Sequence, residues 1–163
     1  MHFLPVLDVI MIGVLATALL DGWVAILNRM GVATLPMGLI GRWVGHMGRG
    51  RIAHAAIRQA ASVRYETTLG WIVHYATGVA FAAVLGAVVG PGWLDAPTPG
   101  PALLMGALSV GMPLFIMQPA MGAGFASSRT PTPAKNVVRS VANHLVLGLG
   151  FYLAAVVIRA IGL

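Results

Sequence analysis

Residues 70–90 read GWIVHYATGVAFAAVLGAVVG and contain no charged side chain. At about 1.5 Å per residue, a helix of this length crosses a hydrocarbon core of about 30 Å, so the stretch predicts a membrane-spanning helix. One polar and four small residues recur every four positions and share one face: His74, Gly78, Ala82, Gly86 and Gly90. Because small residues let helix backbones approach closely, we expect this face to pack against another helix.

The composition of the whole chain points to the same environment. Of its 163 residues, 58% are hydrophobic and 9% are charged, whereas about a quarter of residues are charged in an ordinary soluble domain. The mean hydropathy is +0.88. Cysteine is absent, which excludes disulfides, thiolate metal sites and a cysteine nucleophile. The sequence therefore predicts a membrane protein, with the lipid bilayer as its main partner.

Four apolar runs are long enough to span the bilayer as helices. They predict an all-α, polytopic four-helix bundle within a single membrane domain, residues 1–163, with spans at about 4–28, 69–90, 101–122 and 136–161. The first run lacks a basic leader segment and continues past a small-residue motif, so we expect it to be retained. Pro113 and Pro119 fall in the third run and predict a kink or local unwinding, because proline removes a backbone hydrogen bond. Thr132 and Pro133 predict the start of the last helix, as N-cap and first helical residue.

The first connection, residues 29–68, is basic and amphipathic. An apolar face between Leu39 and Met47 opposes Arg42 and His46, and a second apolar and basic segment follows Gly48. Such segments commonly lie in the headgroup region with arginines toward anionic lipid. The predicted headgroup contacts are Arg42, Arg49, Arg51 and Arg58.

The basic residues also predict orientation. Nine of the ten lie in or beside the first and third connections, and only Arg159 lies on the other side. The positive-inside rule places both connections in the cytoplasm. We therefore expect a multi-pass protein of the bacterial inner membrane with both termini periplasmic. This distribution explains the isoelectric point of about 11.2 without nucleic acid as a partner.

Polar side chains inside the spans form a predicted polar layer. Asp21, His74, Gln118 and His144 each lie about 6 to 10 Å inside the cytoplasmic boundary, counted along their helices. The pattern His-x3-Gly-x2-Phe occurs at His74 and again at His144, so the chain could consist of two tandem two-helix repeats.

Three functions fit this layer. In the first, the side chains only hold helices together, and the protein is a non-enzymatic accessory or self-associating subunit of a membrane complex. In the second, Asp21 with His74 or His144 serves a small proton-coupled transporter or channel. In the third, His74 and His144 ligate a haem b iron. The first function is our leading interpretation, and it requires no cofactor.

We expect neither a metal site nor an enzyme. His46 and His54 are eight residues apart, about 12 Å along a continuous helix, which is too far for one ion unless the chain folds back at Gly48. No HExxH motif occurs, and Ser127 and Ser128 lack a nucleophile elbow.

Four stretches carry a resemblance to a known family: GRWVGHMGRGRIAH (41–54), ETTLGWIVHYATG (66–78), MQPAMGAGFASSRTP (117–131) and NHLVLGLGFYLA (143–154). They resemble an uncharacterised bacterial family of small inner-membrane proteins that is known only as a domain of unknown function. The resemblance implies a bacterial four-span membrane protein. It brings no activity, substrate or cofactor with it.

Overall fold

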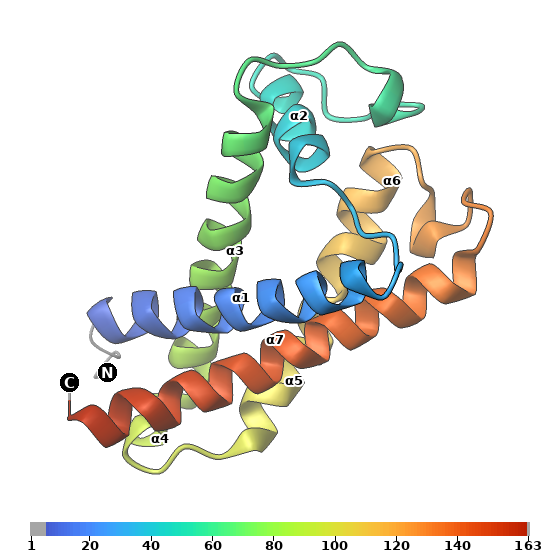
Figure 1. The fold of residues 1–163 in the computed structure, drawn as a ribbon. Coiled ribbons are helices and arrows are strands. Elements are labelled where there is room, and N and C mark those ends of the chain that lie inside the picture. The colour runs from blue at the N-terminus through green and yellow to red at the C-terminus, as the bar shows by residue number, and fades with distance from the viewer. Residues whose placement is uncertain (1–5, 163) are drawn as a thin grey trace. The chain divides into compact units, whose positions relative to one another are not determined.

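The computed structural model describes residues 6–162, which are 76% helical and contain no strand. Four helical segments are long and apolar enough to cross a membrane: α1 (Val6–Arg29), α3 (Glu66–Val89), the third span (Pro99–Ala120) and α7 (Pro133–Ile161) (Figure 1). The all-α fold is confirmed, and so is the prediction of four apolar helices long enough to cross a membrane. Residues 4 and 5 of the first predicted span lie outside the described residues.

Short elements fill the connections. They are α2 (Met37–Met47), η1 (Ile57–Gln59), α4 (Gly92–Asp95) and η3 (Phe125–Ser127). The apolar face predicted between Leu39 and Met47 lies on α2. The second apolar and basic segment, after Gly48, contains irregular backbone at residues 51–56. Helix α7 begins at Pro133, as predicted, and the carbonyl of Thr132 accepts a hydrogen bond from the Asn136 N–H.

The third span is interrupted near its middle. It consists of α5 (Pro99–Ser109), the π-helical turn η2 (Met112–Met117) and α6 (Gln118–Ala120). The Gln118 N–H bonds the carbonyl of Pro113, five residues back. Because proline cannot donate the hydrogen bond that a regular helix needs, the chain widens locally at Pro113. The predicted local unwinding is confirmed.

The described chain forms two compact units. Unit 1 contains residues 6–32, 75–109 and 143–162, and unit 2 contains residues 33–74 and 110–142. Helices α3 and α7 contribute to both units. Each unit draws on the first and the second half of the sequence, so neither corresponds to one of the two tandem repeats considered above.

Close backbone contacts hold the helices of unit 1 together. A Cβ atom on Gly13 of α1 would lie 2.5 Å from the Cα of Val79 on α3, and Gly78 meets the Thr17 side chain. Gly150 of α7 similarly packs against Ala16. In the predicted small-residue face, Gly78, Ala82 and Gly86 are buried, and Gly90 ends the helix with a positive φ. The face therefore packs within the chain itself.

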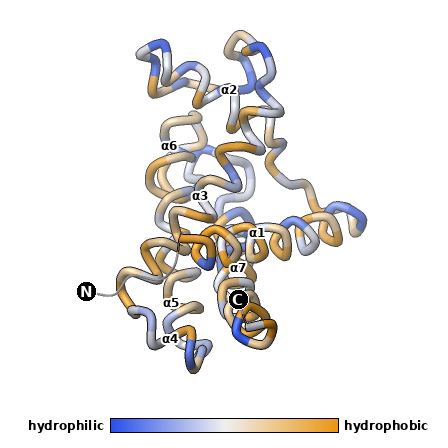
Figure 2. Tube along the Cα trace, turned by 90° about the vertical axis from the view of Figure 1, so that its left-hand side faces the viewer, coloured by the Kyte–Doolittle hydropathy of each residue, from blue (hydrophilic) through white to orange (hydrophobic). Residues whose placement is uncertain are grey.

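Unit 2 is held by a smaller core and by irregular backbone. Its core contains Leu39, Trp43, Ile57 and Met121. The His54 N–H donates to the Ala120 carbonyl at 2.8 Å, and the Ile57 N–H donates to the Met121 carbonyl at 3.0 Å. These bonds fix the irregular segment 54–57 against the end of the third span. Figure 2 shows hydrophobic residues along the long helices and hydrophilic residues gathered in connections and at helix ends.

Candidate functional site

Three side-chain hydrogen bonds link the spans of unit 1. Tyr75 Oη donates to Asp21 Oδ2 at 2.8 Å, and Trp23 Nε1 donates to Asn143 Oδ1 at 3.1 Å. Ser109 Oγ and His144 Nδ1 lie 2.7 Å apart. We call these the inter-helix pairs. Together they involve all four spans, and all six residues belong to unit 1. They satisfy polar groups that would be costly in hydrocarbon.

The inter-helix pairs include two members of the predicted polar layer, Asp21 and His144. The other two members belong to unit 2. His74 makes an edge contact with the Trp71 ring, with centroids 5.8 Å apart, and Gln118 Oε1 accepts a hydrogen bond from Ser127 Oγ at 2.9 Å. A single layer of all four side chains stays a prediction. So does haem ligation by His74 and His144, which lie in different units.

Unit 2 contains an arginine clamp, which we define as Arg42, Glu66 and the carbonyls around η1. Arg42 Nε and Nη2 donate to the two carboxylate oxygens of Glu66 at 2.9 and 2.7 Å. Arg42 Nη1 donates to the carbonyls of Arg58 and Ala60 at 3.3 and 3.1 Å. The hydrogen bond to Glu66 raises the pKa of Arg42 above its usual value. The clamp ties α2 to the start of α3 and to η1.

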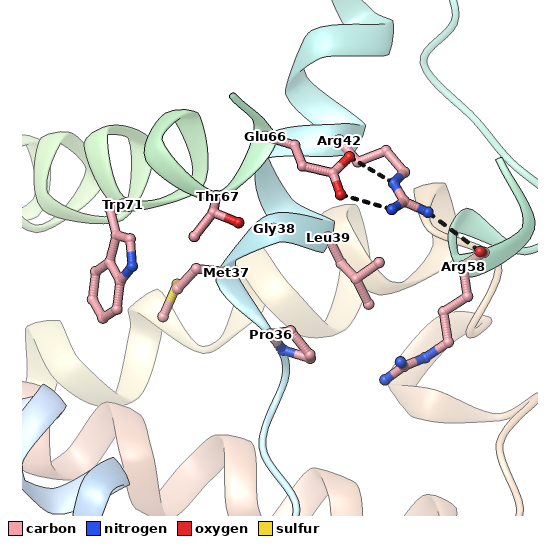
Figure 3. A pocket seen from close by; sticks show the side chains of 9 residues that line it. All are labelled: Pro36, Met37, Gly38, Leu39, Arg42, Arg58, Glu66, Thr67 and Trp71. Carbon is pink, nitrogen blue, oxygen red and sulfur yellow. Dashed lines mark hydrogen bonds and ion pairs between the residues drawn. The ribbon is translucent and has the colours of Figure 1, made fainter. Parts of the chain in front are cut away.

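A pocket of about 370 Å³ opens beside the clamp (Figure 3). Its lining residues are Pro36, Met37, Gly38, Leu39, Arg42, Arg58, Glu66, Thr67 and Trp71. The Arg42 guanidinium is directed to Glu66 and to backbone carbonyls. The other three arginines predicted to contact headgroups, Arg49, Arg51 and Arg58, are exposed. Lipid contact by the four arginines stays a prediction.

Two histidines of unit 2 lie side by side, and we call them the histidine pair. The His46 and His54 ring centroids are 5.0 Å apart at an interplanar angle of 66°. The turn after α2 makes this possible, since Gly50 has a φ of +80° and the Arg51 N–H bonds the His46 carbonyl at 3.0 Å. The chain thus folds back after Gly48. Without this turn, His46 and His54 would lie about 12 Å apart along a continuous helix.

The two rings differ in their surroundings. His46 Nε2 lies 2.9 Å from the Ala61 carbonyl, whereas both nitrogens of His54 are buried without a hydrogen-bond partner. Burial lowers the pKa of His54, the charges of Arg51 and His46 lower it further, and the nearby Ala120 backbone offsets part of this shift. Within residues 6–162, no group of three or more His, Cys, Asp or Glu side chains could hold a metal ion.

A family model described as "Protein of unknown function (DUF2938)" matches residues 10–158. The chain belongs to the DUF2938 family. This confirms the resemblance to an uncharacterised family. Comparisons with curated proteins and with solved structures gave no match.

Sequence reasoning missed several polar residues of this DUF2938 member. Tyr75 and Asn143 each lie one position from a predicted histidine, so the same counting of depth could have found them. Ser109 gives no such signal, because serine is common in helices that pack in membranes. Chemically, the inter-helix pairs can hold helices together, and the ionisable Asp21 and His144 can also exchange protons.

Proposed function

We propose that this DUF2938 member is a non-enzymatic protein of the bacterial inner membrane that works as an accessory or self-associating subunit of a membrane complex. One observation carries the proposal: in the most apolar window of each span, only 22% to 39% of residues are buried by the chain itself. The remaining apolar faces need cover from lipid or from another membrane protein. The inter-helix pairs support the proposal, because polar groups bonded between neighbouring spans stabilise a packed membrane protein without any further chemistry.

The small-residue face of α3 does not supply the association surface. Since Gly78, Ala82 and Gly86 are buried inside the chain, a partner must meet other positions. Val84 and Val88 of α3 are 50% and 76% exposed, and Leu104 and Leu108 of α5 are 59% and 67% exposed. These bulky outward-facing side chains are the association surface that we propose for the spans.

The absence of native cysteine permits a clean test. Single cysteines introduced at Val84, Val88, Leu104 and Leu108 are cross-linked in native membranes, with Ala82→Cys as the buried control. We expect a protein adduct, either with a second copy or with a partner that also co-purifies in mild detergent, from at least one exposed position and none from Ala82→Cys. If every exposed position reacts only with lipid-soluble reagents, and the purified protein is a monomer without partners, the proposal is wrong.

A second candidate is proton-coupled transport. The observation that favours it is the π-helical turn at Met112–Met117, because such turns are frequent at functional sites and interrupted helices occur in transporters. Asp21, bonded to Tyr75, would carry the proton. In proteoliposomes, Asp21→Asn should abolish a proton-linked flux while the protein remains folded. A flux that Asp21→Asn leaves unchanged, or no flux from the natural sequence in a broad substrate panel, would exclude this candidate.

A further inference from the structure

The pocket beside the arginine clamp combines apolar and polar lining residues (Figure 3). The apolar lining consists of Pro36, Met37, Leu39 and the Trp71 ring. The polar lining consists of Arg42, Arg58, Glu66 and Thr67. The volume of about 370 Å³ lies at the lower end of the range of about 300–1,000 Å³ that is typical of small-molecule sites. This mixed lining fits an amphiphile better than a purely polar ligand.

The two arginines of the pocket differ in what they can offer a ligand. Each guanidinium nitrogen of Arg42 already donates, either to Glu66 or to backbone carbonyls near η1. Arg58 is exposed, and Figure 3 shows its side chain extending away from Glu66 with no interaction drawn to another lining residue. Because Arg42 and Glu66 neutralise each other, Arg58 leaves the pocket with one net positive charge. The pocket therefore favours an anion, and Arg58 is the residue that can bind it.

The pocket lies where an apolar span begins. Glu66 is the first residue of α3, which is long and apolar enough to cross a membrane. Trp71 follows about 8 Å further along the helix, and its side chain is 42% exposed. Tryptophan is enriched where lipid headgroups meet the hydrocarbon core. When α3 crosses a bilayer, the pocket therefore lies at the level of the lipid headgroups.

The walls of the pocket are fixed by close backbone packing between α2 and α3. A Cβ atom on Gly41 would overlap the backbone of Glu66, and one on Gly70 would overlap the backbone of Met37. Gly38 leaves room inside the pocket, since a Cβ atom there would lie 3.2 Å from Thr67 Oγ1. The arginine clamp joins the same two helices. Binding therefore requires little ordering of the chain, which favours affinity.

We propose that this pocket binds the headgroup of an anionic phospholipid, and that Arg58 binds the lipid phosphate. A guanidinium group donates two parallel hydrogen bonds to phosphate oxygens, and the Thr67 hydroxyl can donate another. The glycerol and the first part of the acyl chains then contact Met37 and Trp71.

The lining also favours an anionic lipid over a zwitterionic one. Glu66 is the acidic residue among those that line the pocket, and both of its carboxylate oxygens bond Arg42. The pocket therefore has no unpaired carboxylate for the ammonium group of a zwitterionic headgroup. A lipid with one negative charge, such as phosphatidylglycerol, matches the single positive charge of Arg58.

The test measures lipid binding by the full chain in detergent, using native mass spectrometry with added phosphatidylglycerol or phosphatidylcholine. We expect one phosphatidylglycerol to bind in preference to phosphatidylcholine. Arg58→Gln should weaken its binding at least about tenfold, the loss expected for one hydrogen bond to a charged group. Arg129→Gln is the matched control, because Arg129 is an exposed arginine of unit 2 that does not line the pocket. It should bind the lipid as the natural sequence does.

Three results would overturn the proposal. Equal losses in Arg58→Gln and Arg129→Gln would show general attraction between lipid and a basic protein. Phosphatidylcholine bound as tightly as phosphatidylglycerol would show that the headgroup charge is not recognised. Glycerol phosphate bound as tightly as phosphatidylglycerol would assign the site to a soluble anion.

Tryptophan fluorescence locates the bound lipid. Phosphatidylglycerol with a doxyl group near the headgroup end of one acyl chain quenches tryptophans close to it. Because Trp71 lines the pocket, Trp71→Phe should lose the saturable part of the quenching. Trp93→Phe, on α4 in unit 1, should retain it. Saturable quenching that persists in Trp71→Phe would place the lipid elsewhere and refute the site. These outcomes do not depend on whether the protein is an accessory subunit.

Discussion

Replacing Glu66 by glutamine should weaken unit 2 by breaking the arginine clamp. The natural pair has two hydrogen bonds, at 2.9 and 2.7 Å, and its side chains are only 15% and 20% exposed. Exposed ion pairs contribute about 0–1 kcal/mol, whereas removing one partner of a buried pair costs about 3–5 kcal/mol. With this intermediate exposure, we expect Glu66→Gln to lower the free energy of unfolding by about 2–3 kcal/mol.

The assay is thermal unfolding in detergent, combined with tryptic cleavage of the basic first connection. Arg49→Gln is the matched control, because Arg49 lies in the same connection and is exposed. A double-mutant cycle with Arg42→Met should give a coupling energy of about 1–2 kcal/mol, since the two side chains bond each other directly. If Glu66→Gln is no more destabilising than Arg49→Gln, and the coupling energy is near zero, the reasoning about the clamp fails.

Three further predictions concern helix packing, pH and haem. Gly13→Ala should destabilise unit 1 by about 1–3 kcal/mol because its new methyl group overlaps Val79. Gly22 lies on the same helix with open space around it, so Gly22→Ala should instead stabilise the protein by about 0.5–1 kcal/mol. Equal melting temperatures for the two variants would contradict the close contact between Gly13 and Val79. The pKa of His54 is lowered in the folded protein. As the pH falls below about 6.5, His54 is therefore protonated in the unfolded state before it is protonated in the folded state, and the free energy of unfolding decreases. Between pH 7.5 and 5.5 the natural protein should therefore lose more stability than His54→Gln, and parallel losses would count against this reading. Protein expressed with ample haem should show no Soret band, and a band that disappears in His74→Gln and His144→Gln would instead support the haem site.

Much of the fold could be predicted because local sequence determines it. The length of each apolar run determines the spans, and Pro113 cannot donate the backbone bond that a regular helix requires. The start of α7 at Pro133 follows from proline's fixed φ angle. These features depend on neighbouring residues only.

The rest depends on contacts between distant residues. The backbone hydrogen bonds from His54 and Ile57 to Ala120 and Met121 join segments that are far apart in sequence. No periodicity in the sequence predicts these bonds. The histidine pair depends on a specific turn with Gly50 at positive φ. Glycines in the sequence make such a turn possible but do not predict that it forms. Depth along a helix identified Asp21 and His144 as polar positions but did not identify Tyr75 and Ser109 as their partners.

The central claim is that four spans place the arginine-rich first connection in the cytoplasm, and cysteine labelling of intact cells tests it most directly. Gln59 of the first connection and Ala96 of the second are both exposed, and the natural chain has no cysteine. A membrane-impermeant maleimide should label Ala96→Cys in intact cells and Gln59→Cys only after the membrane is permeabilised. Labelling of Gln59→Cys in intact cells, with Ala96→Cys protected, would contradict the account.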